Sequence, residues 1–207
     1  MSYKDFTLEQ IEQAFGLVIH GNVNLFGERH PAFVLNPAFV SYLDYSTKLA
    51  LSINTEKARS EMIIAPILIE LKRLTQDQIS LFSGVEFNVD PTQGLNGYCD
   101  FIISRSTQQF YIQAPVAILV EAKNENIKGG LAQCFAAMIA ANIFNQAKGN
   151  LIDTVYGAVT TGNQWKFLKI TNNAAYVDTE DYYIDKLEKI VDILLSMVNV
   201  QPLALSV

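Results

Sequence analysis

The chain opens with apolar residues at helical spacing. Thr7 is followed three residues later by Gln10, a pairing that closes two free backbone donors at a helix start, and Gly21 is a natural end point. We therefore expect a first helix over residues 7–21. The next thirty residues are rich in Pro, Asn and aromatic side chains and fit neither a helical nor a strand period, so we expect short helical turns and loop there.

A second helix is indicated further along. Asn54 and Thr55 are candidate caps, and Pro66 is expected to kink the helix because its ring removes a backbone hydrogen bond. The apolar positions at helical spacing are Ile63, Ile67, Leu71 and Leu74.

Beyond residue 80 the period changes to that of strands. Three short segments, separated by Pro, Gly and Asn, are rich in β-branched and aromatic residues, so we expect three antiparallel neighbours. They are FSGVEFNVD (82–90), GYCDFIISR (97–105) and PVAILVEAK (115–123). An uncharged helix is expected from about Lys128 to Lys148. Two more strands, DTVYGAVTTG and QWKFLKITN, are expected to be joined by a Gly162-Asn163 turn.

The last segment, 178–200, has the pattern of an amphipathic helix. Its apolar stripe consists of Ile184, Leu187, Val191, Leu194 and Val198. The order of helices, three strands, helix, two strands and helix predicts the α/β class, with a mixed sheet flanked by helices. We expect a single domain over residues 1–207, because a chain of 207 residues that is 50% hydrophobic and 17% charged can bury a large core.

Charge and cysteine content narrow the function classes. The net charge of −6 opposes binding to polyphosphates, but six of the 21 acidic residues lie after residue 177, so the rest of the chain is nearly balanced. Cys99 and Cys134 lie in apolar patterns and are expected to be buried thiols. His20 and His30 have no acidic or cysteine partner at ligand spacing, so we assign them no role.

The amides in the uncharged helix argue against a membrane span. The N-terminus lacks the pattern of a secretory signal, so a cytoplasmic location without membrane association is expected.

The candidate chemistry lies where an apolar strand becomes polar. Glu121 and Lys123 should emerge on one side of their strand, about 7 Å apart, while Ala122 points away. If the preceding strand pairs with this one, Asp100 can sit beside Glu121. Two adjacent carboxylates repel each other unless a cation lies between them, and their hard oxygens suit Mg²⁺ or Mn²⁺.

Such a group can act on phosphodiesters. With a divalent ion on the two acids, Lys123 would face the phosphate or the attacking water and stabilise the extra negative charge of the transition state. The residues therefore predict a hydrolase of nucleic-acid backbones.

At this point the sequence resembles the restriction-endonuclease-like, or PD-(D/E)XK, nuclease superfamily. The resemblance rests on Asp100 and on Glu121-Ala122-Lys123, and it covers roughly residues 55–172 in matching element order. The chain is similar in particular to the N-terminal nuclease domain of type I restriction motor subunits. The sequence GYCD stands where the family name has proline-aspartate, and Ala137 stands where the glutamine-bearing branch often has tyrosine.

The resemblance implies an α-β-β-β-α-β core and an Mg²⁺-dependent endonuclease acting on DNA. It implies that Asp100 and Glu121 bind the metal and that Lys123 positions or activates water. It also implies a supporting role at the metal or its water for Glu61, in the helix before the strands. On the helix after them, Gln133 matches a glutamine found in some branches.

Each of these two supporting residues also has a simpler interpretation. Glu61 shares a helical face with Ile64 and Leu68, but it can equally form a surface ion pair with Lys57 or Arg59. Gln133 can satisfy backbone groups within its apolar helix.

Aromatic and basic residues could add a nucleic-acid surface. Tyr98, Tyr111, Trp165 and Phe167 could stack on bases or belong to a core. A positive edge could be lined by Lys123, Lys128, Lys148, Lys166 and Lys169.

Two other function classes stay open at this point. One is a non-catalytic module of the same fold that uses its acidic C-terminal helix for homodimerisation or a protein partner. The other is an acid-base enzyme on a small substrate, with Glu121 as a metal-free base.

Overall fold

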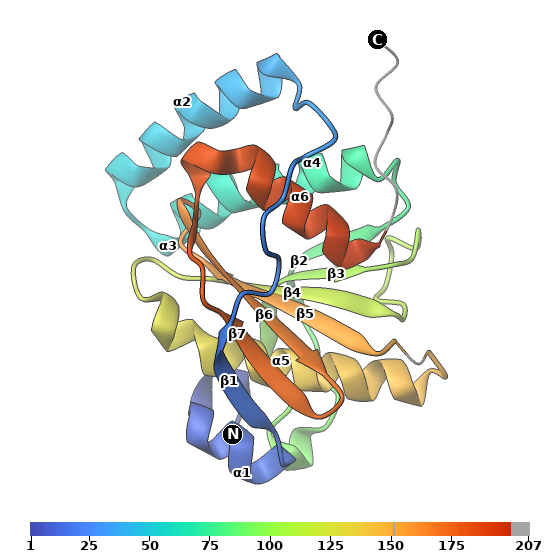
Figure 1. Ribbon diagram of the computed structural model, residues 1–207. Coiled ribbons are helices and arrows are strands. Elements are labelled where there is room, and N and C mark those ends of the chain that lie inside the picture. Colours follow the sequence, from blue (N-terminus) through green and yellow to red (C-terminus); the bar gives the residue numbers. More distant parts are fainter. Residues whose placement is uncertain (151, 200–207) are drawn as a thin grey trace.

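One mixed β-sheet organises the chain, and helices cover both of its faces (Figure 1). The computed structural model describes residues 1–150 and 152–199. The eight strands follow the order β1-β7-β6-β5-β4-β3-β2, and β8 pairs with β6. The expected α/β class, a mixed sheet flanked by helices, is confirmed.

The strands combine antiparallel and parallel pairs. They are β1 (Val18–Val23), β2 (Ser80–Glu86), β3 (Tyr98–Ser104), β4 (Val116–Ala122), β5 (Thr154–Thr160), β6 (Gln164–Thr171), β7 (Ala174–Asp178) and β8 (Tyr182–Tyr183). The expected antiparallel trio β2, β3 and β4 is confirmed, as is the β5–β6 hairpin. Strands β4 and β5 are parallel, so the chain needs a crossover between them, which the long helix α5 provides.

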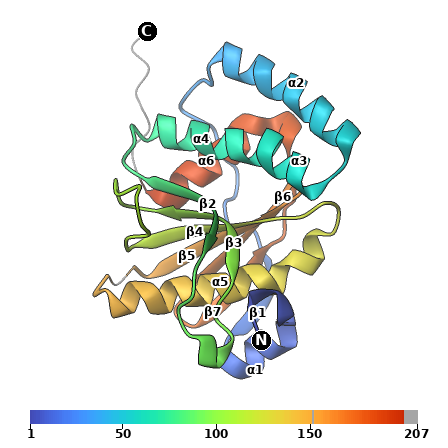
Figure 2. The same ribbon diagram turned by 180° about the vertical axis from the view of Figure 1, so that it is seen from behind.

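The helices form layers on the two faces of the sheet. They are α1 (Leu8–Phe15), α2 (Pro37–Ile53), α3 (Glu56–Arg59), α4 (Ala65–Leu74), α5 (Ile127–Ala147) and α6 (Leu187–Val198). Helix α5 covers one face, with α1 beside it, whereas α4 and α6 cover the other face, with α2 outside them (Figure 2).

Helix α5 is long and apolar enough to cross a membrane by length and composition, but 61% of its most apolar window is buried against the rest of the chain. Its buried Asn145 accepts a hydrogen bond from the backbone N–H of Val116 (2.7 Å) and donates one to the carbonyl of Val116 (2.8 Å). The polar amide therefore ties the helix to β4, as expected for a core helix.

The N-terminal helix is shorter than expected. Its Thr7–Gln10 capping box is confirmed, but α1 ends at Phe15 because Gly16 adopts a left-handed conformation (φ 61°). The residues from Val18 onward then form β1, which pairs in parallel with β7. The prediction of helix up to Gly21 was therefore wrong.

The segment predicted as loop contains a full helix. Asn36 caps α2 by accepting a hydrogen bond from the backbone N–H of Ala38 (2.8 Å), and Pro37 occupies the first turn. The Asn-Pro pair is a helix-start signal that the mixed composition of this segment obscured.

The C-terminal segment is also divided differently from the prediction over 178–200. Strand β8 and a 3₁₀ turn (Ile184–Lys186) precede α6, and Val200 lies outside the described residues. The apolar stripe of α6 packs into the core cluster shared with α4 and the sheet. Homodimerisation through this helix stays a prediction, and the buried stripe is not available for it.

Candidate active site

Asp100 and Glu121 lie side by side at one end of the sheet. In the antiparallel pair of β3 and β4, Phe101 is opposite Val120, and Asp100 and Glu121 are the next residues outward on the two strands. The Asp100 carboxylate also accepts a hydrogen bond from the backbone N–H of Ala122 (2.7 Å), which fixes it against β4. The structure thus brings together the two acids predicted from the sequence.

These acids lie in a cavity of about 430 Å³. Its lining comes from β3, β4, α3, α5 and the N-terminal turn, and consists of Ser2, Tyr3, Lys4, Glu56, Gly97, Tyr98, Asp100, Glu121, Lys123 and Gln133. Glu121 is only 5% exposed, so its carboxylate is recessed from the solvent. Four of the five site residues predicted from the sequence therefore line one cavity.

Lys123 joins Glu121 to helix α5. Its Nζ lies 2.5 Å from Oε1 of Glu121 and 3.3 Å from Oε1 of Gln133. The lysine stem runs over the first turn of α5, where a Cβ on Gly130 would come within 3.1 Å of Lys123 Cε and 2.7 Å of Val159 Cγ1. The glycine thus allows the helix to approach closely enough for Gln133 to reach the site.

Burial dominates the electrostatics of the acids. It raises the pKa of Asp100, although the Ala122 N–H and the charge of Lys123 oppose the shift. Burial, reinforced by the charge of Asp100, raises the pKa of Glu121 from 4.5 to about 8. Burial alone would lower the pKa of Lys123, but attraction to Glu121 outweighs it, so the pKa is raised and the ammonium form is retained.

Glu61 lies away from this cavity, which corrects its expected role. Its side chain is 58% exposed and forms an ion pair with Lys57 at 3.0 Å. The glutamate that faces the cavity from the preceding helices is Glu56, and its negative charge helps raise the pKa values of Asp100 and Glu121. Glu56 was missed because the sequence offers two glutamates in one helical segment.

A wide helical turn explains why Glu56 faces the cavity and Glu61 does not. Residues Ser60–Ile64 form a π-helical turn between α3 and α4, and it ends two residues before Pro66. The extra residue in this turn rotates the preceding residues relative to those that follow. Glu61 is therefore exposed although Ile64 and Leu68 are fully buried, contrary to the shared face of a regular α-helix.

The buried Arg59 fixes α3 against the site. Its guanidinium donates hydrogen bonds to neutral oxygens of Asn54 (2.9 Å), Asn124 (3.2 Å), Thr161 (3.0 Å) and Asn163 (2.8 Å). These partners belong to the end of α2, to the residue after Lys123 and to the β5–β6 turn. Arg59 thereby sets the position of Glu56 relative to Lys123.

The acids offer oxygen ligands to a metal, although in residues 1–150 and 152–199 no group of three or more His, Cys, Asp or Glu side chains is placed to hold one. Two carboxylates suit Mg²⁺, which keeps several waters and takes further ligands from substrate phosphates. Asp100 Oδ2 and Glu121 Oε1 accept hydrogen bonds, whereas Asp100 Oδ1 and Glu121 Oε2 accept none from the part of the chain that the structure describes. The donor set fits Mg²⁺ or Mn²⁺.

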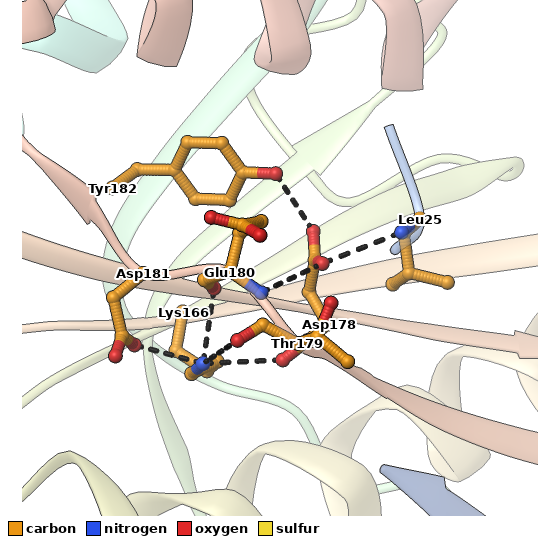
Figure 3. Close-up of polar contacts among 7 residues, drawn as sticks. All are labelled: Leu25, Lys166, Asp178, Thr179, Glu180, Asp181 and Tyr182. Carbon is orange, nitrogen blue, oxygen red and sulfur yellow. Dashed lines mark hydrogen bonds and ion pairs between the residues drawn. The ribbon is translucent and has the colours of Figure 1, made fainter. Parts of the chain in front are cut away.

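The aromatic and basic residues divide between core and surface. Trp165 and Phe167 are fully buried, whereas Tyr98 and Tyr111 are exposed. Lys166, expected on a positive edge, instead contacts the carbonyl oxygens of Asp178, Thr179 and Glu180 and the carboxylate of Asp181 at 2.8 Å (Figure 3). Its charge therefore secures the β7–β8 connection and is not offered to a ligand.

The same connection holds a buried acid. Asp178 accepts hydrogen bonds from the hydroxyl of Tyr182 (2.9 Å) and from the backbone N–H groups of Glu180 (3.1 Å) and Leu25 (3.3 Å), as Figure 3 shows. These contacts give Asp178 a structural role.

The two cysteines, Cys99 and Cys134, are free and buried, as expected. Their role is also structural.

The sequence was compared with protein-family models and with curated proteins. A scan of the sequence against protein-family models finds no match, and a search of curated proteins finds none. The resemblance to PD-(D/E)XK nucleases therefore stays a prediction from the sequence positions of Asp100, Glu121, Lys123 and Gln133.

Proposed function

We propose that this protein is a metal-dependent phosphodiester hydrolase that acts on DNA, with Asp100 and Glu121 as ligands of Mg²⁺ or Mn²⁺. The observation that carries the proposal is a pair of adjacent carboxylates in a recessed cavity where burial opposes the charge of both. Three carboxyl and two ammonium groups line the cavity when Glu56 and Lys4 are included. With all three carboxyl groups ionised the net charge of these groups is −1, and one bound divalent ion would make it +1, which favours a phosphodiester.

The protein residues have separate roles in this proposal. When bound, the metal would supply a Lewis acid at the phosphate. The Lys123 ammonium, held by Glu121 and Gln133, would stabilise the negative charge that grows on the phosphate in the transition state. Glu56 faces the cavity from α3 and would orient the attacking water or accept its proton.

Cleavage assays test this proposal directly. Supercoiled, linear and single-stranded DNA are incubated with the protein and Mg²⁺ or Mn²⁺, with EDTA as the control. We expect cleavage that is lost in Asp100→Asn and Glu121→Gln while circular dichroism shows that both variants fold. If the wild-type protein leaves all three DNA forms intact with either metal, the proposed activity is wrong.

The two glutamates before the sheet provide a matched pair. Glu56→Gln should reduce cleavage by about 100-fold or more, because a positioned acid or base typically contributes that much. Glu61→Gln removes the same charge from an exposed position outside the cavity and should leave cleavage unchanged. Equal effects of the two substitutions would refute the assignment of Glu56.

One observation favours a second candidate, a metal-free acid-base enzyme on a small substrate. A pKa of about 8 for Glu121 suits a general base near neutral pH. Isothermal titration with Mn²⁺ separates the two candidates. Binding at one site that Glu121→Gln abolishes supports the hydrolase, whereas absence of Mn²⁺ binding to the folded protein supports the metal-free base.

A further inference from the structure

The cavity that contains the two acids has an aromatic rim. Tyr98 begins β3 two residues before Asp100, which lines the same cavity. The tyrosine lines the cavity and is 65% exposed. Its ring therefore offers a flat surface at the entrance to the carboxylates.

The N-terminal 3₁₀ turn, Tyr3–Asp5, forms another part of the rim. Tyr3 is buried, its hydroxyl donates to the carbonyl of Phe87, and its backbone N–H donates to the carbonyl of Asn96 (3.1 Å). These contacts anchor the turn to the segment that leads into β3. The exposed Lys4 is thereby held at the cavity beside Ser2.

The depth of the site limits which DNA can reach it. Glu121 is recessed in a cavity whose volume of about 430 Å³ suits a small-molecule ligand or a single nucleotide. The bases of a duplex stay stacked and paired outside such a space, whereas an unpaired nucleotide can enter it with its base. A base that leaves its stack loses favourable contacts, and an aromatic side chain can replace them.

Charge alone supplies little affinity here. The cavity is lined by three carboxyl and two ammonium groups, and the whole chain carries a net charge of −6. Attraction between lysines and phosphates, which dominates binding by basic proteins, is therefore weak. Stacking does not depend on net charge, so a ring at the entrance matters more in this protein than in a basic one.

We propose that the site takes an unpaired DNA strand, with one base stacked on Tyr98 and a neighbouring phosphate contacting Lys4. This inference rests on the proposed nuclease function and names its substrate class as single-stranded DNA or unpaired ends. Tyr98 and Lys4 are binding residues in this arrangement, and the acids are reached only after they engage the strand.

Binding without cleavage tests the inference separately from catalysis. The affinity of the protein for a fluorescent oligothymidine and for a blunt duplex of equal length is measured by anisotropy in EDTA. Tyr98→Ala should weaken binding of the single strand by about 5- to 150-fold, the range for loss of one stacked base. Tyr98→Phe keeps the ring and should restore most of the affinity. Tyr111→Ala is the matched control, because Tyr111 is 59% exposed and does not line the cavity.

The salt dependence tests Lys4. Lys4→Gln should reduce the slope of log Kd against log salt for the single strand by about 0.7, the loss of one phosphate contact. Lys48→Gln, a change at an exposed lysine on α2 outside the cavity, should leave that slope unchanged.

The outcomes separate this inference from the proposed function. Tyr98-dependent binding of the single strand without metal-dependent cleavage would retain the binding surface and refute the nuclease. Cleavage of DNA together with equal affinities for Tyr98→Ala and Tyr111→Ala would retain the nuclease and overturn the inference. Tighter binding of the blunt duplex than of the single strand would also overturn it.

Discussion

Replacing Glu121 with Gln should change how the stability of the fold depends on pH. The glutamate carries a pKa raised from 4.5 to about 8 in the folded protein, chiefly by burial and secondly by the charge of Asp100. The folded state therefore binds this proton more tightly than the unfolded state does. The stability associated with the group is fully present below pH 4.5, declines as the pH rises, and is lost above pH 8.

The magnitude follows from the shift. One pKa unit corresponds to about 1.36 kcal/mol, so full ionisation of Glu121 lowers the free energy of unfolding by at most about 5 kcal/mol. Glu121→Gln keeps the shape without the charge. It also removes the partner of Lys123, which is 2.5 Å away, so the measured gain should fall below this bound.

Urea unfolding of both proteins at several pH values provides the assay. The difference in unfolding free energy, variant minus wild type, should be flat below about pH 4.5 and should then increase by several kcal/mol up to about pH 8. Added Mn²⁺ should stabilise the wild type most at high pH, where the carboxylate is free to bind it, and should not stabilise the variant. A difference that stays constant from pH 4 to pH 9 would refute the raised pKa of the buried Glu121 carboxyl group.

Three further substitutions test the contacts that hold α3 and α5 in place around the site. Arg59→Ala should lower the free energy of unfolding by about 3 kcal/mol, because the buried carbonyl of Thr161 and two partly buried amide oxygens lose a charged donor; a change below about 1 kcal/mol in urea unfolding would contradict this role. Gly130→Ala should cost about 1–3 kcal/mol through overlap with Val159 and Lys123, visible as a lower melting temperature, and an unchanged melting temperature would show that α5 does not approach so closely. Asn145→Leu should cost about 2–4 kcal/mol and accelerate hydrogen exchange at its backbone partner on β4, whereas unchanged exchange would place the amide outside this contact.

The pairing of Asp100 with Glu121 could be predicted from the sequence because it depends on short-range rules. Side chains alternate along a strand, and two neighbouring antiparallel strands set their residues opposite one another. Gly97 marks the start of the first strand-like run that contains these acids and Pro115 the start of the second, so their starts could be predicted. The capping box of the first helix was readable for the same reason, since its two residues are three positions apart.

Helical spacing alone could not show whether Glu56 or Glu61 faces the cavity. A π-helical turn inserts one residue into the helical repeat and rotates the first glutamate toward the cavity. Regular periodicity assigned the second glutamate to the apolar face, and the structure places it in a surface ion pair with Lys57. Local pattern could not choose between them, because the turn is fixed by packing of α3 and α4 against other parts of the chain.

The sequence by itself determined the α/β class, the antiparallel trio of strands and the two carboxylates with their lysine, because each follows from periods of two to four residues. Only the tertiary structure decided which glutamate completes the cavity and that Lys4 and Tyr98 form its rim. These side chains come from segments nearly a hundred positions apart and meet because Tyr3 is buried against the loop before β3. Contacts between distant segments depend on how whole elements pack, and no local repeat along the chain records that packing.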